Sequence, residues 1–178
     1  MSSTLTKAEA EAAIRTLAVL VVDDNPHTRK LVRSLLLHMG VKEVFEAADG
    51  IAGLEAIRIV GPDIVVLDWE LPLLNGAEFV RIVRSPGVFP RPDVPIIMLT
   101  AHGQRSRVVE AARLGINEFL CKPIAPKALY ERIIAIIAKP RPFVQLGTYY
   151  GPQPRRLLDG EPHVDPVIAP PAAGTPLN

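Results

Sequence analysis

The sequence has few of the features that mark secreted, membrane-spanning or nucleic-acid-coating proteins. Its single cysteine, Cys121, cannot form a disulfide within the chain, and this usage is typical of a reducing compartment. The most apolar early run, residues 17–22, is too short to cross a bilayer and lacks the flanking features of a signal peptide. The formal net charge is only +1, which gives no general attraction to nucleic acid or to a membrane surface. We therefore expect a cytoplasmic protein that binds neither DNA nor membrane.

What the sequence does contain is a regular alternation of short apolar runs with longer amphipathic segments. Short runs rich in β-branched residues are typical of strands that are buried on both faces of a parallel sheet, and parallel strands need helix-length connections. The expected strands are residues 17–22, 44–47, 64–67, 95–99 and 118–121. The expected helices are residues 28–39, 51–60, 76–84, 106–114 and 126–138. Five strand–helix units in a row predict an α/β domain with a parallel sheet covered by helices on both faces.

The two ends of the chain differ in composition from this middle region. Residues 1–16 are polar and rich in alanine and glutamate, and they could form a short helix. Residues 139–178 contain about half of the 18 prolines and have no sustained apolar period, so we expect an extended or disordered tail. The sequence thus predicts an N-terminal extension of residues 1–16, a domain of residues 17–138 and a proline-rich C-terminal tail of residues 139–178.

Polar side chains follow four of the five predicted strands. In chain order they are Asp23 with Asp24, Asp68, Thr100, and Lys122 with Pro123. The carboxyl ends of parallel strands meet at one edge of a sheet, which is where ligands bind in folds of this class. Clustered carboxylates repel one another unless a proton or a cation compensates, and Mg²⁺ prefers oxygen ligands of this kind. The set therefore predicts a Mg²⁺ site that could hold a phosphoryl group, with an ammonium and a hydroxyl available for its oxygens.

Taken together, four motifs resemble the signature of the response-regulator receiver domain. They are Val21-Val22-Asp23-Asp24-Asn25, the stretch from Leu67-Asp68-Trp69-Glu70 through Leu71-Pro72-Leu73-Leu74-Asn75-Gly76, Thr100-Ala101, and Cys121-Lys122-Pro123. Their order and spacing match that family from about residue 17 to residue 138. The resemblance implies a flavodoxin-like (βα)5 fold, which is a doubly wound parallel sheet with strand order 2-1-3-4-5.

The resemblance also implies roles for the acidic residues. Asp68 would accept a phosphoryl group from a histidine kinase, a phosphotransfer protein or a small phosphodonor. Asp23 and Asp24 would bind Mg²⁺ together with Asp68 and the backbone carbonyl of Glu70. The chain would then be a phosphoprotein of a two-component phosphorelay and not an enzyme that acts on other substrates.

Further residues would contact the phosphoryl group, transmit its presence or set its lifetime. Thr100, Ala101 and Lys122 would surround the phosphoryl group, and the Lys122–Pro123 peptide bond would be cis. Phe119 would be the aromatic residue that changes rotamer together with Thr100. The tuning positions for autodephosphorylation, each two residues beyond a site residue, would be Glu70 and His102. Trp69 is expected to be partly exposed beside the site.

Two other functions stay open at the level of sequence. A haloacid-dehalogenase-like phosphatase also uses strand-end aspartates and a lysine, but its nucleophile lies in an Asp-x-Asp motif after the first strand. Here the first strand is followed by Asp23-Asp24-Asn25, which favours the receiver. A receiver scaffold that works through its tail, independently of phosphorylation, is the second alternative, and the intact set of motif residues argues against it.

The expected output of the switch is contact with another protein. The residues after Ala138 are too few for a DNA-binding domain and show no helix-turn-helix pattern. In this family the signalling face is formed by the fourth helix, fifth strand and fifth helix, here about residues 105–137, and it permits a phosphorylation-dependent homodimer. The residues expected on this face are Arg105, Arg107, Arg113 and Arg132, beside the apolar Val108 and Ile133. The tail interleaves aromatic residues with arginines, so it could dock a partner or a phosphate-bearing ligand, or pack back on the domain through Phe143 and Tyr149.

Overall fold

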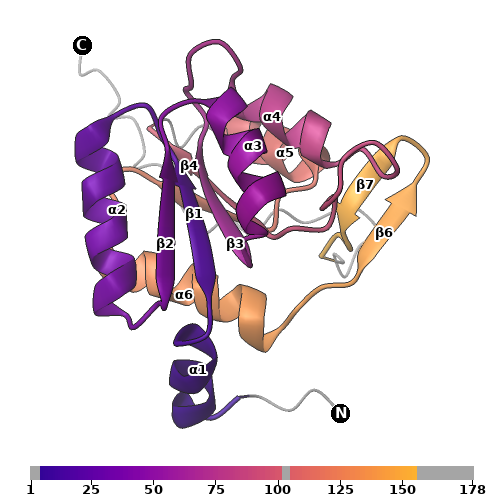
Figure 1. Cartoon of the computed structure of the whole chain (residues 1–178). Helices are drawn as coiled ribbons and strands as arrows, with labels where there is room; N and C mark the ends of the chain where they lie inside the picture. Colours follow the sequence, from indigo (N-terminus) through magenta and orange to yellow (C-terminus); the bar gives the residue numbers. More distant parts are fainter. Residues whose placement is uncertain (1–4, 102–104, 156–178) are drawn as a thin grey trace, which may run out of the picture.

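A central parallel sheet lies between two layers of helices in the computed structural model, which describes residues 5–101 and 105–155 (Figure 1). The strands of this sheet are β1 (Ala18–Val22), β2 (Glu43–Ala47), β3 (Ile64–Asp68), β4 (Ile96–Thr100) and β5 (Glu118–Cys121). Neighbouring strands are all parallel, and their order is β2-β1-β3-β4-β5. The predicted flavodoxin-like (βα)5 sheet with order 2-1-3-4-5 is therefore confirmed.

Six helices accompany the sheet in the described part of the chain. They are α1 (Lys7–Ile14), α2 (Pro26–His38), α3 (Gly50–Val60), α4 (Gly76–Val83), α5 (Arg105–Leu114) and α6 (Pro126–Ala138). The last five are the predicted helices, and α1 is the short helix that the N-terminal composition allowed. Because α1 comes first, the predicted fourth and fifth helices carry the labels α5 and α6. Every helix in residues 5–101 and 105–155 is too short or too polar to cross a lipid bilayer.

The strands are apolar on both faces because each face of the sheet is covered. Successive side chains of a strand point to opposite faces. In β1, Leu20 and Val22 join the cluster that contains Phe79 of α4, whereas Val19 and Val21 join the cluster that contains the buried residues of α2 and α6. The continuous apolar runs in the sequence therefore reflect a two-sided core, and polar side chains are left for the strand ends.

Residues 143–152 form an antiparallel hairpin of strands β6 (Phe143–Leu146) and β7 (Tyr149–Pro152). The hairpin lies beside the end of α5 (Figure 1), where the backbones of Gly115 and Gly151 come so close that a Cβ on Gly151 would lie 2.7 Å from Gly115 Cα. The expectation of disorder is wrong for these residues, whereas the alternative that Phe143 packs back on the domain is confirmed by its contact with Arg84. The remainder of the predicted tail, from residue 156, lies outside the described residues, and the division of the chain into three parts stays a prediction.

A buried arginine at the end of α4 connects the hairpin to the domain. Arg84 Nε donates to the carbonyl oxygen of Gly115 at 2.8 Å, Nη1 donates to that of Pro92 at 2.7 Å, and Nη2 donates to Oδ1 of Asn117 at 3.2 Å. Its guanidinium also lies 4.9 Å from the ring centre of Phe143, a cation–π contact. One side chain thus joins α4, the loops that precede β4 and β5, and the hairpin.

Candidate functional site

The carboxyl ends of the strands bring the three predicted acidic residues together. Three carboxylate oxygens, one each from Asp23, Asp24 and Asp68, lie within 4.8 Å of one another. Asp23 and Asp68 are buried, with 0% and 4% exposure, whereas Asp24 is exposed. Within the described residues, this is the group of acidic side chains that could hold a metal ion.

Lys122 is the cation that faces these carboxylates. Its Nζ lies 3.0 Å from Oδ2 of Asp23 and 3.0 Å from Oδ1 of Asp68, and it follows directly after β5. Burial opposes its charge, but its hydrogen bond to Asp23 and its attraction to both carboxylates outweigh burial and raise the pKa of Lys122. The Lys122–Pro123 peptide bond is cis.

Asp68 holds its negative charge at a cost in free energy. Burial, together with the charges of Asp23 and Asp24, raises the pKa of Asp68 from 3.8 to about 6, although Lys122 acts in the opposite direction. The ion pair between Lys122 and Oδ1 of Asp68 lacks hydrogen-bond geometry, and within the described residues this buried oxygen has no hydrogen bond. Three carboxylates against one ammonium, with a buried oxygen short of donors, fit a hard divalent cation such as Mg²⁺.

The loop after Asp68 is fixed by the start of α4. Asn75 and Glu78 form a capping box, in which each side chain accepts a hydrogen bond from the other residue's backbone N–H. The N–H of Gly76 donates to the carbonyl oxygen of Trp69 at 2.9 Å. A Cβ at Gly76 would lie 2.8 Å from the carbonyl oxygen of Asp68, so only glycine allows the helix to start this close to the acid.

Trp69 is covered by an arginine from α5. The ring is only 4% exposed, so the expectation of partial exposure is wrong. The guanidinium of Arg107 lies 4.9 Å from the ring centre of Trp69, and its Nη2 lies 3.3 Å from Oε1 of Glu70. The two residues that follow Asp68 are therefore both in contact with α5.

The other predicted site residues occupy different surroundings. Thr100 is buried at the end of β4, beside Cys121 in the register with β5, and Ala101 is exposed. Phe119 is half-buried and packs against the core cluster on the α4 face of the sheet. His102 lies outside the described residues.

The predicted signalling face differs from expectation at two positions. Ile133 is fully buried in the core cluster beneath α6, so the prediction of an apolar surface residue there is wrong; its place on the helix directs it toward the sheet. Arg132 is largely buried, and its Nη1 lies 3.7 Å from Oε2 of Glu118. Arg113 is exposed and Val108 is half-buried, and the side chain of Arg105 is outside the described part.

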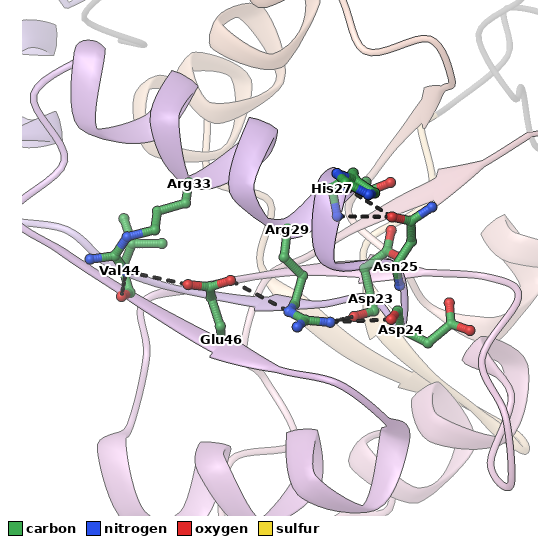
Figure 2. Close-up of polar contacts among 9 residues, drawn as sticks. Asp23, Asp24, Asn25, His27, Arg29, Arg33, Val44 and Glu46 are labelled. Atoms are coloured by element: carbon green, nitrogen blue, oxygen red, sulfur yellow. Dashed lines mark hydrogen bonds and ion pairs between the residues drawn. The ribbon is translucent and has the colours of Figure 1, made fainter.

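Sequence reasoning missed an arginine that contacts the backbone of the acidic pair. Figure 2 shows Arg29 of α2 between Glu46 and the carbonyl oxygens of Asp23 and Asp24. One signal was available in the sequence: a basic residue in the first turns of a helix is unfavourable beside the helix dipole, so it often has a local partner. Asn25 caps the same helix by accepting hydrogen bonds from the N–H groups of His27 and Thr28.

Comparison with known proteins gives a consistent result. A family model described as the response regulator receiver domain matches residues 19–134. The chain is 32% identical over 120 residues to the chemotaxis protein CheY1 of Helicobacter pylori. This alignment covers 67% of this chain and 95% of that protein. It is 30% identical over 125 residues to the chemotaxis protein CheY-3 of Vibrio cholerae, covering 70% of this chain and 95% of that protein.

Solved structures show the same likeness. The receiver domain of the Francisella response regulator 1452 superposes with a TM-score of 0.62 at 27% identity, covering 70% of this chain and 98% of that one. The chemotaxis protein CheY4 of Vibrio cholerae superposes with a TM-score of 0.59 at 32% identity, covering 65% of this chain and 94% of that one. The region matched by the family model, residues 19–134, includes Asp23, Asp24 and Asp68.

Proposed function

The chain belongs to the response-regulator receiver family of two-component signalling, and on this premise we propose that Asp68 is its phosphoacceptor. The observation that carries the proposal is the position of Asp68 itself. Its carboxylate is buried at the end of β3, 3.0 Å from Lys122, and it lies within 4.8 Å of the carboxylates of Asp23 and Asp24. The phosphoryl group would come from a histidine kinase or a phosphotransfer protein.

In the proposed reaction an oxygen of Asp68 forms a bond to phosphorus as the bond from phosphorus to the donor's nitrogen or oxygen breaks. The product is an acyl phosphate, and the leaving group departs with the bonding electrons. Lys122 then pairs with a phosphoryl oxygen in place of the Asp68 oxygen, and Thr100 donates its hydroxyl hydrogen to another. Mg²⁺ held by Asp23, Asp24, Asp68 and the carbonyl of Glu70 would neutralise the charge of the phosphoryl oxygens.

The chemistry is confined to this protein's own carboxylate. Receiver domains are acceptors and not classical enzymes, so we propose that the chain catalyses only its own phosphorylation and dephosphorylation. Glu70 is a proposed tuning position because its side chain follows the acceptor and is held by Arg107 at the rim of the site. His102 is proposed for the same role.

The output proposed for the phosphorylated state is altered contact with a protein target or a second copy of the chain. Thr100 and Phe119 would respond to the phosphoryl group, since Thr100 ends β4, the strand beside β3, and Phe119 lies on β5, the strand after it in the sheet. The surface that would change is formed by α5, β5 and α6. The hairpin of residues 143–152 contacts the end of α5, so it stands beside that surface.

The test is the intact mass of the protein after incubation with acetyl phosphate and Mg²⁺. We expect one added phosphoryl group, no addition after chelation of Mg²⁺, and no addition in Asp68→Ala. Asp63→Ala is the matched control, because Asp63 is an exposed aspartate just before the same strand, and it should be phosphorylated normally.

A negative result would be checked with a second phosphodonor and with beryllofluoride binding. If all three fail, phosphorylation is excluded and the receiver scaffold becomes the function to pursue. Continuous hydrolysis of phosphorylated metabolites, with release of many phosphates per protein, would instead indicate a phosphatase.

A further inference from the structure

The loop that carries Asp23 and Asp24 is held by a side chain from the helix that follows it. Arg29 lies in the first turns of α2, and its side chain is 19% exposed. Its Nη1 donates to the carbonyl oxygen of Asp23 at 2.8 Å and to that of Asp24 at 3.3 Å. Hydrogen bonds from a charged donor are stronger than neutral ones, so this guanidinium restrains the main chain of the acidic pair.

The same guanidinium is anchored on the neighbouring strand. Nε of Arg29 lies 3.4 Å from Oε1 of Glu46, which stands beside Val21 in the register of β1 and β2. Oε2 of Glu46 also lies 3.7 Å from Nη1 of Arg33. Figure 2 shows the resulting row of side chains, which runs from Arg33 through Glu46 and Arg29 to the acidic loop. The loop is thereby tied to β2 as well as to its own helix.

Asp24 depends on this restraint more than Asp23 does. The Asp23 carboxylate accepts a hydrogen bond from the N–H of Asn25 at 2.8 Å and another from Nζ of Lys122 at 3.0 Å. The Asp24 carboxylate is exposed, and in the part of the chain that the structure describes it has no hydrogen bond or ion pair. Its place within 4.8 Å of the other two carboxylates is therefore set by its main chain, which Arg29 holds at the carbonyl.

We propose that Arg29 is a positioning residue for the cation site: it keeps the Asp24 carboxylate within reach of Asp23 and Asp68 and thereby sets the affinity for Mg²⁺. This inference rests on the proposed function, since it takes the three carboxylates as the cation's ligands. A group that orients ligands without touching the metal typically changes metal affinity by about 10-fold or more. The guanidinium charge also offsets part of the repulsion among the carboxylates.

Arg33 provides a matched control on the same helix. It also pairs with Glu46, and its Nη1 donates to a main-chain carbonyl oxygen, that of Val44, at 2.7 Å. The structure gives it no contact with the acidic loop, so its loss removes similar interactions without releasing Asp24. A difference between Arg29 and Arg33 variants in Mg²⁺ affinity therefore reports on the loop and not on general stability.

The experiment measures Mg²⁺ binding to the full chain by isothermal titration calorimetry, with the fluorescence of Trp69 as a second readout. We expect Arg29→Gln to weaken Mg²⁺ binding about 10-fold and Arg33→Gln to change it less than about twofold. Arg29→Lys should recover part of the affinity because an ammonium can still donate to one carbonyl. At saturating Mg²⁺, phosphorylation of Arg29→Gln by acetyl phosphate should return close to the wild-type rate.

Each other outcome has a definite meaning. Equal affinities of Arg29→Gln and Arg33→Gln would overturn the inference while leaving the proposed function intact. A wild-type protein that does not bind Mg²⁺ would overturn the cation site, and both proposals would fail with it. If Arg29→Gln does not fold, Arg29→Lys and Arg33→Lys are compared instead, and equal affinities of these two would overturn the inference. A phosphorylation defect that saturating Mg²⁺ does not restore would also contradict it.

Discussion

The buried polar and charged residues of the described chain form two groups at opposite ends of the sheet. Asp23, Asp68 and Thr100 lie at the carboxyl ends of the strands, and Arg84 and Glu118 lie at the amino ends of β4 and β5. Burying a charge is costly at either end unless partners compensate for it. The two groups differ in how far the protein itself supplies that compensation.

At the carboxyl end the charges are not balanced. Three carboxylates face one ammonium, and burial raises the pKa of Asp68 to about 6 despite its contact with Lys122. At the amino end the two buried groups are hydrogen-bonded or ion-paired, although burial still lowers the pKa of Arg84 to about 10 and raises the pKa of Glu118. Arg84 donates to three acceptors, and Glu118 lies 2.6 Å from Arg155 and 3.7 Å from Arg132. A cluster of like charges with a buried oxygen short of donors is typical of a ligand site, whereas a network of hydrogen bonds between segments holds those segments together.

The largest effect is expected at the amino end of the sheet. Arg84→Ala would leave the carbonyl oxygens of Gly115 and Pro92 and the amide of Asn117 without their donor, and each unsatisfied buried group is costly. We expect the free energy of unfolding to fall by about 3–5 kcal/mol in a urea titration. Arg81→Ala, on the exposed side of the same helix, should change it by less than about 0.5 kcal/mol. A loss below about 1 kcal/mol for Arg84→Ala would show that the amino-end network is dispensable.

At the carboxyl end of the strands, removal of a charge should stabilise the protein instead of destabilising it. The folded-state pKa of Asp68 lies above its usual 3.8, so the folded chain binds the proton more tightly than the unfolded chain does. The stability of the Mg²⁺-free protein should therefore fall as the pH rises from about 4 to above 6, by up to roughly 3 kcal/mol. Asp68→Asn, which cannot ionise, should remove the Asp68 part of this slope, leaving that of Glu118, and should be more stable than wild type at a pH well above 6.

Urea titrations at several pH values in the presence of a chelator would measure this slope. Asp93→Asn, an exposed aspartate, should leave the slope unchanged. Destabilisation by Asp68→Asn throughout the pH range would mean that Lys122 alone balances the acidic cluster. The contrast between the two ends of the sheet would then be lost.

A smaller effect is expected where the hairpin meets the domain. A Cβ on Gly151 would lie 2.7 Å from Gly115 Cα and 2.7 Å from Oη of Tyr149, so Gly151→Ala must displace the hairpin. We expect a loss of about 1–3 kcal/mol and faster hydrogen exchange confined to residues 143–152. In the matched control Gly147→Asn, the added Cβ has nothing within 4 Å and asparagine tolerates a positive φ, so exchange should be unchanged. Unaltered exchange in Gly151→Ala would show that the hairpin is not packed as described.

The smallest effect is expected within the hairpin itself. Tyr149 Oη donates to the carbonyl oxygen of Pro152 at 2.7 Å, and Tyr149→Phe removes this single bond at a cost of about 0.5–1.5 kcal/mol. The hydroxyl of Tyr150 has no hydrogen bond within the described residues, so Tyr150→Phe should be nearly neutral. Thermal unfolding of the two variants side by side would measure the difference, and equal melting temperatures would contradict the role assigned to Tyr149.

The fold and the members of the acidic cluster could be predicted from the sequence because both depend on local pattern. Apolar runs such as residues 64–67 are typical of strands buried on both faces, and five of them with helical connections leave few topologies. Asp23, Asp68 and Lys122 each follow such a run directly. Their meeting at one edge follows from parallel strands alone.

The contacts of Trp69, Ile133 and Arg29 could not be predicted in the same way. Whether Trp69 is covered depends on Arg107, which is 38 residues away in the chain and reaches it only when α5 packs on the sheet. Arg29 reads as an ordinary helix-surface residue until Glu46 on β2 lies beside it. The hairpin likewise depends on groups far from it in the chain, such as the carbonyl oxygen of Asn117, which accepts a hydrogen bond from Arg141 at 2.6 Å just before the hairpin begins.

The sequence by itself determined the alternation of strands and helices, the residues at the strand ends and the chemistry that those residues can perform. Each of these is fixed by neighbours within a few positions, through side-chain alternation and helix spacing. Only the tertiary structure decided how the charges are compensated: Asp68 is short of donors, Arg84 is hydrogen-bonded to three neutral acceptors, and Arg29 lies behind Asp24. Compensation depends on distances between groups far apart in the chain, and Coulomb and hydrogen-bond energies change steeply over a few ångströms.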